Sequence, residues 1–218
     1  NEKNQSFDNQ NSTKAKSNYI KKAVKIISNS NKIVIIAGGG IKYTSRYKNV
    51  VKLAELLNVP IVTAAGHGDA IPFNHKLNAG QMGPRGNPVA SKLVKEASVI
   101  IALGTRLGFN STFYSYENIN KRAKIIQVEL EKRMIGRYFP VAVGIYGDAA
   151  TIADQLYKEI KKQNIALDIK KWTNNYFNER KNFLLNRDKF KQKNFPIQPN
   201  GLFKQLRQVL PKNSAITL

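Results

Sequence analysis

The chain has 218 residues, 42% of them hydrophobic, which is enough for one α/β domain with a buried core and some additional helices. It contains no cysteine, which excludes disulfides, thiolate nucleophiles and cysteine-based zinc or iron–sulfur sites. The net charge of +22 would suit nucleic acid or an anionic membrane. However, the basic residues are spread along the sequence without a nucleic-acid-binding motif, and no apolar run could span a membrane or serve as a signal peptide. We therefore expect a cytoplasmic protein that binds neither nucleic acid nor membrane.

The first 17 residues are polar and of low complexity, which predicts a linker or tail. From residue 32 to residue 148, apolar runs alternate with glycine-bearing turns and amphipathic stretches. Five runs have the length and the Val/Ile content of buried strands: residues 32–37, 59–63, 98–103, 123–130 and 141–146.

Three of these strands run directly into a glycine turn: Gly38-Gly39-Gly40, Gly104-Thr105-Arg106 and Gly147-Asp148. Strands that alternate with helices and end in such turns build a parallel, doubly wound sheet, which binds its ligands at the carboxyl ends of the strands. The prediction is therefore a Rossmann-like α/β domain over residues 18–162 with a nucleotide-type site.

Gly38, Gly39 and Gly40 are the first candidates for cofactor binding. They follow a strand and precede a helix that we expect to begin near Tyr43. Consecutive glycines let backbone N–H groups approach a diphosphate at a helix N-terminus, but they equally fit a tight turn that requires positive φ. They do not form a dinucleotide fingerprint, because its third glycine would fall on Tyr43.

The second group of candidates follows the later strands. Gly104 and Thr105 form a similar turn, and Arg106 adds a cation suited to phosphate or to a helix C-terminus. Glu129 and Glu131 end the strand at residues 123–130, where a carboxylate can accept hydrogen bonds from ribose hydroxyls. We expect Gly104, Thr105, Arg106 and Glu129 to contact a cofactor.

Residues 64–86 are predicted to be a long glycine-rich loop, a type of segment that often carries function. It contains both histidines. His67 could bind a ligand phosphate but more often such a residue is solvated or capped, and His75 is expected to be structural. Arg85 is a candidate interface or ligand cation. Two histidines and no cysteine do not make a transition-metal site, so we predict no metal ligand in the chain.

Gly147-Asp148-Ala149, followed by Asn174-Asn175, imitates a motif that binds Mg²⁺ and a diphosphate. That motif needs convergent Asp and Asn oxygens, and a glycine where Ala149 stands. Residues 149–162 have helical spacing of apolar residues. The favoured interpretation is the closing turn of the domain, not a metal site.

The C-terminal part is predicted to be a helical connector over residues 163–199. Its aromatic residues have a spacing typical of a helix face packed on a neighbouring domain: Trp172, Tyr176, Phe177, Phe183 and Phe190. A short amphipathic helix is expected at residues 200–210, and residues 214–218 look like the start of a buried strand. We therefore expect the chain to be an internal piece of a longer protein, with residues 200–218 beginning the next domain.

Residues 18–160 resemble the central domain of the thiamine-diphosphate enzymes typified by acetolactate (acetohydroxyacid) synthase. The matching segments are IVIIAGGGI, LAELLNVPIVTAAGHGDAIP, NHKLNAGQMGPRG, ASVIIALGTRL and AKIIQVELEKRMIGRYFPVAVGIYGDA, in that order. Two features look closer to the sulfoacetaldehyde acetyltransferase-like members: LGTRL followed by FNSTFYSY, and the IIQVE segment.

The resemblance implies a three-domain, homo-oligomeric enzyme that uses thiamine diphosphate and Mg²⁺ on a 2-keto acid or a similar C2 donor, with both catalytic domains outside this chain. It implies no catalytic residue here, and a central domain that binds FAD, ADP or nothing. Glu129 and Glu131 match the paired acids of the family, which are usually Asp. A nucleotide-binding module without catalysis stays open as an alternative, since one fold hosts many functions.

Overall fold

The computed structural model describes residues 13–42, 46–188, 196–211 and 213–214. It divides into two compact units, residues 1–177 and residues 178–218, which are described separately. None of the helices in this described part of the chain is both long and apolar enough to cross a membrane.

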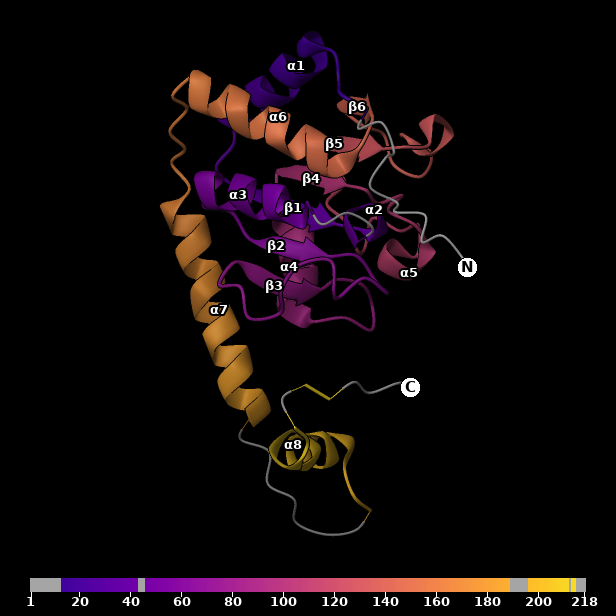
Figure 1. Ribbon diagram of the computed structural model, residues 1–218, viewed down its shortest axis with the longest axis vertical. Coiled ribbons are helices and arrows are strands. Elements are labelled where there is room, and N and C mark those ends of the chain that lie inside the picture. The colour runs from indigo at the N-terminus through magenta and orange to yellow at the C-terminus, as the bar shows by residue number, and fades with distance from the viewer. Residues whose placement is uncertain (1–12, 43–45, 189–195, 212, 215–218) are drawn as a thin grey trace, which may run out of the picture. The chain divides into compact units, whose positions relative to one another are not determined.

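The first unit is built on one six-stranded sheet in which every pair of neighbours is parallel, with the strand order β3-β2-β1-β4-β5-β6 (Figure 1). The chain leaves from the central strand toward one edge and then crosses to build the other half. The strand order therefore reverses between β1 and β4, where ligands of doubly wound sheets bind. The strands are β1 (Ile33–Ala37), β2 (Ile61–Thr63), β3 (Asn78–Gln81), β4 (Val99–Leu103), β5 (Lys124–Glu129) and β6 (Val143–Tyr146).

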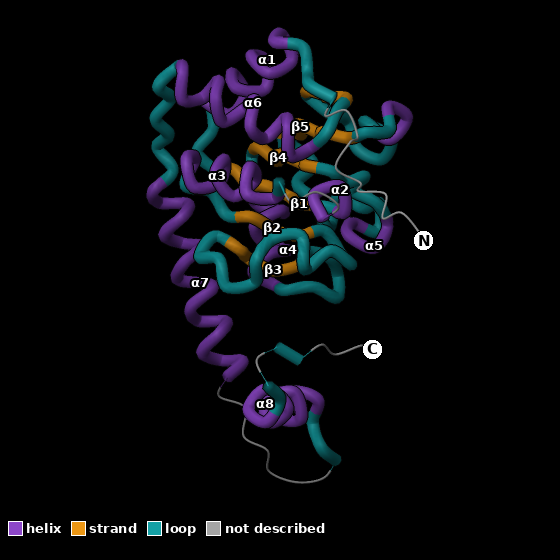
Figure 2. Tube along the Cα trace, viewed as in Figure 1, coloured by secondary structure: helices purple, strands orange, loops and turns teal. Residues whose placement is uncertain are grey.

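Helices cover the sheet, as Figure 2 shows, with the strands enclosed between helical segments. Helix α6 packs against both α1 and α3, while α4 packs against β3. Their buried faces repeat every three to four residues, which is why these segments fold as helices on an apolar sheet. The helices of the first unit are α1 (Ser17–Ser28), α2 (Gly39–Lys42), α3 (Tyr47–Leu57), α4 (Pro88–Glu96), α5 (Phe109–Thr112), α6 (Ala149–Lys162) and the start of α7 (Lys170–Asp188), together with the 3-10 turn η2 (Lys132–Met134).

The central strands β1 and β4 are buried at every position, as expected for a parallel sheet covered on both faces. The five strands that the sequence predicts are present, and the prediction of a Rossmann-like α/β fold is confirmed. Strand β2 begins two residues later than expected, because Asn58 adopts a left-handed conformation (φ 53°) that ends α3, and Pro60 has no N–H for the sheet.

The prediction that residues 64–86 form a loop throughout was wrong, because β3 lies within them and pairs with β2. Its sequence, Asn-Ala-Gly-Gln, has low strand propensity, so it pairs because of its tertiary surroundings. Asn78 is buried there, and its amide group is satisfied: it donates to Pro72 O at 3.1 Å and accepts from Gly80 N at 2.8 Å.

The start of α7 also differs from expectation. Two residues of its predicted aromatic face, Trp172 and Tyr176, pack on the sheet domain of this chain rather than on a neighbouring domain, while Phe190 lies outside the described residues. Trp172 and Tyr176 are buried, and Trp172 Nε1 donates to Ile33 O at 2.9 Å at the beginning of β1. Thr173 Oγ1 donates to Asn58 O, and Tyr176 donates from its hydroxyl to Lys76 O. These bonds join the first turns of α7 to the first unit.

The second unit contains the rest of α7 and α8 (Pro199–Val209), which confirms the helix expected at residues 200–210. Leu202, Phe203 and Val209 on α8 are exposed. The strand expected at residues 214–218 and most of the tail expected at residues 1–17 lie outside the described residues.

Candidate functional site

A pocket of about 510 Å³ opens at the carboxyl ends of β1, β2, β4 and β5, across the point where the strand order reverses. This volume is typical of a small-molecule site. The lining residues come from the last residue of β5 and from the segments that follow β1, β2 and β4, including the short helices α2 and α5: Gly39, Gly40, Ala64, Ala65, His67, Gly104, Thr105, Arg106, Gly108, Phe109, Asn110, Ser111 and Glu129. Six of the seven predicted cofactor-binding residues are thus in one pocket.

The seventh, Gly38, lies directly beneath that wall. A Cβ atom on Gly38 would lie 2.3 Å from Gly104 O and 2.5 Å from Thr105 Cβ, and one on Gly40 would lie 2.8 Å from Gly104 Cα. The two turns are also hydrogen-bonded, since Gly38 N donates to Leu103 O and Gly40 N donates to Gly104 O. The glycines let two neighbouring strand ends touch, backbone to backbone.

This contact corrects the interpretation of the glycine run as a turn that requires positive φ. None of the three glycines has positive φ; the positive-φ residue in this contact is Gly104, with φ 61°. Gly39 and Gly40 belong to the short helix α2, so a helix begins earlier than the predicted start near Tyr43. Tyr43 itself lies outside the described residues. The glycines are required by close packing, and the side of the turn that faces away from this contact forms the pocket wall.

His67 closes the pocket on the β2 side. Its ring packs on Gly39, where an added Cβ would lie 2.8 Å from His67 Cε1. The ring nitrogen Nδ1 is buried and has no hydrogen-bond partner among the described residues. His67 is therefore a partly buried lining residue whose Nδ1 atom is buried and unsatisfied near the site.

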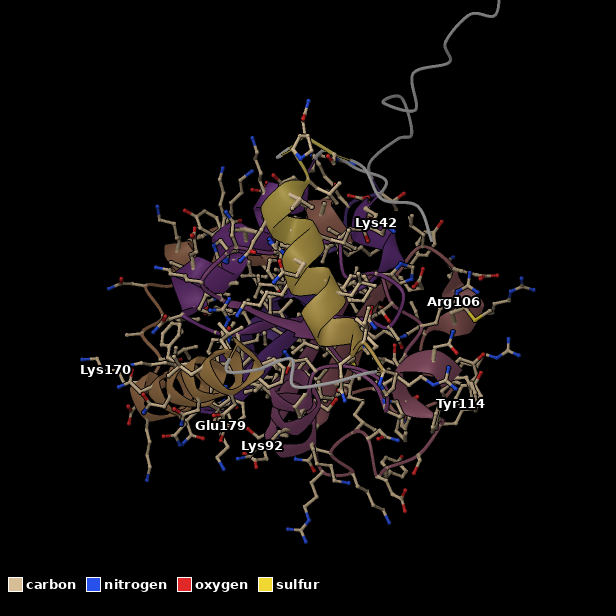
Figure 3. The ribbon with its side chains drawn as sticks, turned by 90° about the horizontal axis from the view of Figure 1, so that it is seen from below. Lys42, Lys92, Arg106, Tyr114, Lys170 and Glu179 are labelled. Carbon is tan, nitrogen blue, oxygen red and sulfur yellow. The ribbon has the colours of Figure 1, made fainter. Side chains whose placement is uncertain are left out.

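Two carboxylates and one guanidinium provide the charge at the β4 and β5 side. Arg106 is 62% exposed and lies 3.9 Å from Glu131 Oε2, while Glu131 also pairs with Arg133. Glu129 is half-buried, and burial raises its pKa, against the lowering effects of the Leu130 N–H and the Arg106 charge. The site thus offers a cation and a hydrogen-bonding carboxyl group within one pocket. Figure 3 shows Arg106 at the surface on the same side of the view as Tyr114.

The remaining lining residues were not predicted from the sequence. Ser111 Oγ accepts from Ala65 N at 3.0 Å, which joins α5 to the turn after β2. Phe109 projects at the pocket margin and is 54% exposed. The sequence after the β4 turn contains several other large apolar side chains, so it gave no signal that singled out Phe109 as a pocket residue.

The other candidates lie elsewhere. His75 Nε2 lies 3.2 Å from Glu55 Oε1, and its Nδ1 accepts from Leu77 N, a structural arrangement like the one expected. Arg85 is exposed and does not line the pocket. Lys42, on α2, forms an ion pair with Asp69 at 2.9 Å, and this hydrogen bond lowers the pKa of Asp69.

The glycine turn after β6 is occupied by the protein itself. Asp148 is the N-cap of α6 and accepts from Thr151 N at 2.8 Å and from Thr151 Oγ1 at 2.6 Å, and Arg46 lies 3.3 Å away. Asn174 and Asn175 are exposed on α7. The Asp148 carboxylate caps α6, which agrees with the interpretation of this segment as the closing turn of the domain rather than a metal site. Within the described residues, no group of three or more acidic or histidine side chains gathers as metal ligands.

Comparison with known proteins identifies the family to which this chain belongs. Residues 20–156 match the family described as "Thiamine pyrophosphate enzyme, central domain". The chain is 34% identical to a sulfoacetaldehyde acetyltransferase of Castellaniella defragrans over 151 residues, which is 68% of this chain and 25% of that protein. It is 30% identical to a probable acetolactate synthase large subunit of Methanococcus aeolicus over 211 residues, which is 91% of this chain and 35% of that protein.

The chain therefore spans about a quarter to a third of the length of the curated relatives it matches. More than half of its residues, including every strand and the whole pocket, lie within the match to the family. The chain belongs to the thiamine pyrophosphate enzyme family, of which it contains the central domain.

Proposed function

We propose that this chain supplies the central domain of a thiamine-diphosphate-dependent, acetolactate synthase-like enzyme that decarboxylates a 2-keto acid and transfers a C2 unit. The support is the family match over residues 20–156 and the likeness to acetolactate synthase large subunits over 91% of the chain. Thiamine diphosphate, when bound, supplies the nucleophilic carbon and the electron sink for such a transfer. The likeness to sulfoacetaldehyde acetyltransferases supports a second candidate, acetyl transfer of that type.

The residues of this chain do not fit the diphosphate and Mg²⁺ of that cofactor. The described residues contain two Gly-Asp sequences. At Gly147-Asp148 the carboxylate caps α6 and contacts Arg46, and at Gly68-Asp69 the carboxylate forms an ion pair with Lys42. We therefore assign no catalytic residue to the chain and place the thiamine diphosphate and Mg²⁺ site, and the catalytic step, in other parts of the parent protein.

We propose that the pocket at the β1–β4 reversal binds a nucleotide, FAD or ADP. One observation carries this proposal: the two glycine turns, Arg106 and Glu129 all line the same pocket of about 510 Å³. The backbone at Gly39, Gly40 and Gly104 lets a diphosphate approach closely, Arg106 supplies the opposing charge, and Glu129 accepts from ribose hydroxyls. Gly38 and Thr105 act as supports, because Gly38 packs closely on Thr105 and donates its N–H to Leu103 O, which holds the two turns together.

The remaining proposals concern the parent protein and the domain division of this chain. We propose that it is a cytoplasmic dimer or tetramer with small-molecule substrates. In the chain, residues 18–162 form the central domain, residues 163–199 form the connector and residues 200–218 begin the diphosphate-binding domain. The exposed apolar residues of α8, Leu202, Phe203 and Val209, support this last assignment, because a neighbouring core would bury them.

The experiment is to purify the parent protein, record its visible absorption spectrum, and assay it with thiamine diphosphate and Mg²⁺ on pyruvate and on sulfoacetaldehyde. Flavin absorbance with acetolactate formation supports the synthase. A colourless protein that acts on sulfoacetaldehyde favours the acetyltransferase-like candidate. A protein without thiamine-dependent activity on either substrate, but with nucleotide bound, contradicts the enzymatic proposal and leaves a binding module.

A further inference from the structure

The segment before α1, residues 13–16, is attached to the sheet domain, although its sequence predicts part of a linker or tail. Its backbone is extended at Lys16, with φ −65° and ψ 142°. Exposure alternates along it: Lys14 and Lys16 are exposed, whereas Thr13 and Ala15 are half-buried. This alternation is typical of an extended chain that lies along a surface. We call residues 13–16 the strap.

The strap is bound through its backbone. Asp148 N, at the start of α6, donates to Thr13 O at 3.1 Å. Further along the same helix, the side-chain amide of Gln155 accepts from Ala15 N at 2.9 Å and donates to Ala15 O at 3.1 Å. Gly147 permits the close approach, because a Cβ atom there would lie 2.5 Å from Thr13 O. Each of these bonds is made to a backbone atom of the strap, so the site binds extended backbone.

Helix α1, which follows the strap, is held by apolar burial instead. Its residues Ile20, Ala23, Val24 and Ile27 are buried, and the helix packs on α6 and β6. Figure 1 shows α1 beside α6. Burial of apolar side chains stabilises this contact, whereas the strap contributes mainly hydrogen bonds that water can replace. The chain therefore passes from a polar attachment to an apolar one at the beginning of α1.

The start of α7 is attached to the same domain in a different way from the strap. Trp172, Thr173 and Tyr176 are buried, and each side chain donates a hydrogen bond to a backbone carbonyl of the first unit. Opening this attachment exposes two aromatic rings, whereas opening the strap exposes polar groups. The free energy of a local opening rises with the apolar surface that it exposes. The strap is therefore the less costly of the two attachments to open.

We propose that the strap is a releasable attachment. Residues 13–16 leave Asp148 and Gln155 in one step, while α1 and the sheet stay folded, and the chain that precedes α1 then pivots at the beginning of that helix. With the strap bound, this chain is fixed beside the carboxyl end of β6. In the parent protein that we propose, the strap thus controls how firmly the segment before Thr13 is held against the central domain.

The test is native-state hydrogen exchange of the whole 218-residue chain, followed by NMR at low denaturant concentrations. The amides of Ala15 and Asp148 lie on opposite sides of the strap contact, so one opening exposes both. We expect their protection to be equal within about twofold and independent of denaturant. The amide of Thr173 donates to Ile169 O at 3.0 Å, and we expect it to exchange at least about 100-fold more slowly and to accelerate with denaturant.

Two results would contradict release of the strap as a unit. Equal protection of Ala15 and Thr173 would show that the strap opens only when the domain unfolds. Protection at Asp148 that differs from that at Ala15 would show that the two ends open separately. Absence of protection at Ala15 would overturn the strap itself.

Substitution of Gln155 tests the site. Gln155→Ala removes both bonds to Ala15 and is expected to raise exchange at Ala15 and Asp148 together, by about tenfold. Gln163→Ala is the matched control, because Gln163 ends the same helix and its side chain bonds to Glu159 of that helix. Unchanged exchange at Asp148 in Gln155→Ala, or equal acceleration in Gln163→Ala, would overturn Gln155 as the contact that holds the strap.

Substitution of Ala15 tests whether the site binds backbone. Ala15→Pro removes the N–H from which Gln155 accepts, whereas Ala15→Ser keeps it. We therefore expect faster exchange at Asp148 in the proline variant and unchanged exchange in the serine variant. The same acceleration in both variants would show that the side chain at this position, rather than the backbone, is bound.

Discussion

The glycine turns at the carboxyl ends of the strands have different roles at the β1–β4 reversal and after β6. At the β1–β4 reversal, Gly38 and Gly104 bring two strand ends into contact, and the surface beside them opens into the pocket. After β6, a Cβ on Gly147 would lie 2.5 Å from Thr13 O, and Asp148 N donates to the same oxygen at 3.1 Å. The second turn is closed by the N-terminal segment and by the capped helix α6.

The difference shows that a glycine turn after a parallel strand identifies a close approach but not what approaches. At β1 and β4 the approaching group is a neighbouring strand end, which leaves the outer surface open to a ligand. At β6 the approaching group is Thr13, and the Asp148 carboxylate that a metal would need already accepts from Thr151. Position within the sheet, at or away from the reversal of strand order, separates the two cases.

The largest expected effect comes from separating the two turns at the pocket. Gly38→Ala places a methyl group within 2.3 Å of Gly104 O, so the backbone must shift, and the free energy of unfolding is expected to fall by about 2–3 kcal/mol. Thermal unfolding followed by circular dichroism measures it. Gly68→Ala is the matched control: an added Cβ there meets only Gln81 Oε1, at 3.8 Å, so stability should hold. Equal stability of the two variants would contradict the close approach.

The turn after β6 is tested through its cap. Asp148→Ala removes the acceptor of two hydrogen bonds at the start of α6 and is expected to lower the free energy of unfolding by about 1–2 kcal/mol. Denaturant unfolding measures the change, and ADP affinity is expected to stay the same. Asp168→Ala, at an exposed carboxylate, is the control. Loss of ADP binding with intact stability would show that this turn, too, is a ligand site.

The charge on the pocket is tested at Arg106. Arg106→Ala is expected to weaken ADP binding about tenfold, because a charge-assisted contact to the diphosphate is lost, without a change in melting temperature. Isothermal calorimetry gives the affinity. Arg133→Ala serves as the control, since Arg133 pairs with the same Glu131 but does not line the pocket. Equal effects of the two substitutions would indicate general electrostatic attraction instead of a specific contact.

The smallest effect is expected at Glu129. Burial raises its pKa in the folded protein, so the folded state retains the proton more strongly than the unfolded state and stability falls as pH rises above the ordinary value of 4.5. Glu129→Gln is therefore expected to melt at a slightly higher temperature than the unchanged chain at pH 7, with the difference vanishing at pH 4. Glu117→Gln, at an exposed carboxylate, should show no such pH dependence. A higher melting temperature only at pH 4 would reverse the assigned sign.

The sequence predicts most of the fold because Val- and Ile-rich runs of five or six residues identify strands that are buried on both faces. Strand β3 has no such run of Val and Ile. Its residues Asn78 and Gln81 pair with β2 through their backbone, and the side-chain amide of Asn78 is satisfied by a local hydrogen bond, which the sequence pattern does not indicate. The helical spacing around Trp172 predicts a buried face but not its partner, which is the beginning of β1 rather than another domain.

The candidate site was predictable in part. Gly39, Gly104 and Arg106 come shortly after strands and Glu129 ends one, and parallel strands bring such residues to one edge of the sheet. The contact between His67 and Gly39 depends on how the segment after β2 folds back, which local sequence does not specify.

The most direct test of the difference between the two glycine turns is to follow the backbone amide resonances of the 218-residue chain by NMR during addition of ADP. We expect the resonances of Gly39, Gly104 and Thr105 to shift, while those of Gly147 and Asp148 stay in place. Shifts centred on Gly147 and Asp148, or no shifts at millimolar ADP, would contradict the assignment of the pocket at the β1–β4 reversal as the nucleotide site.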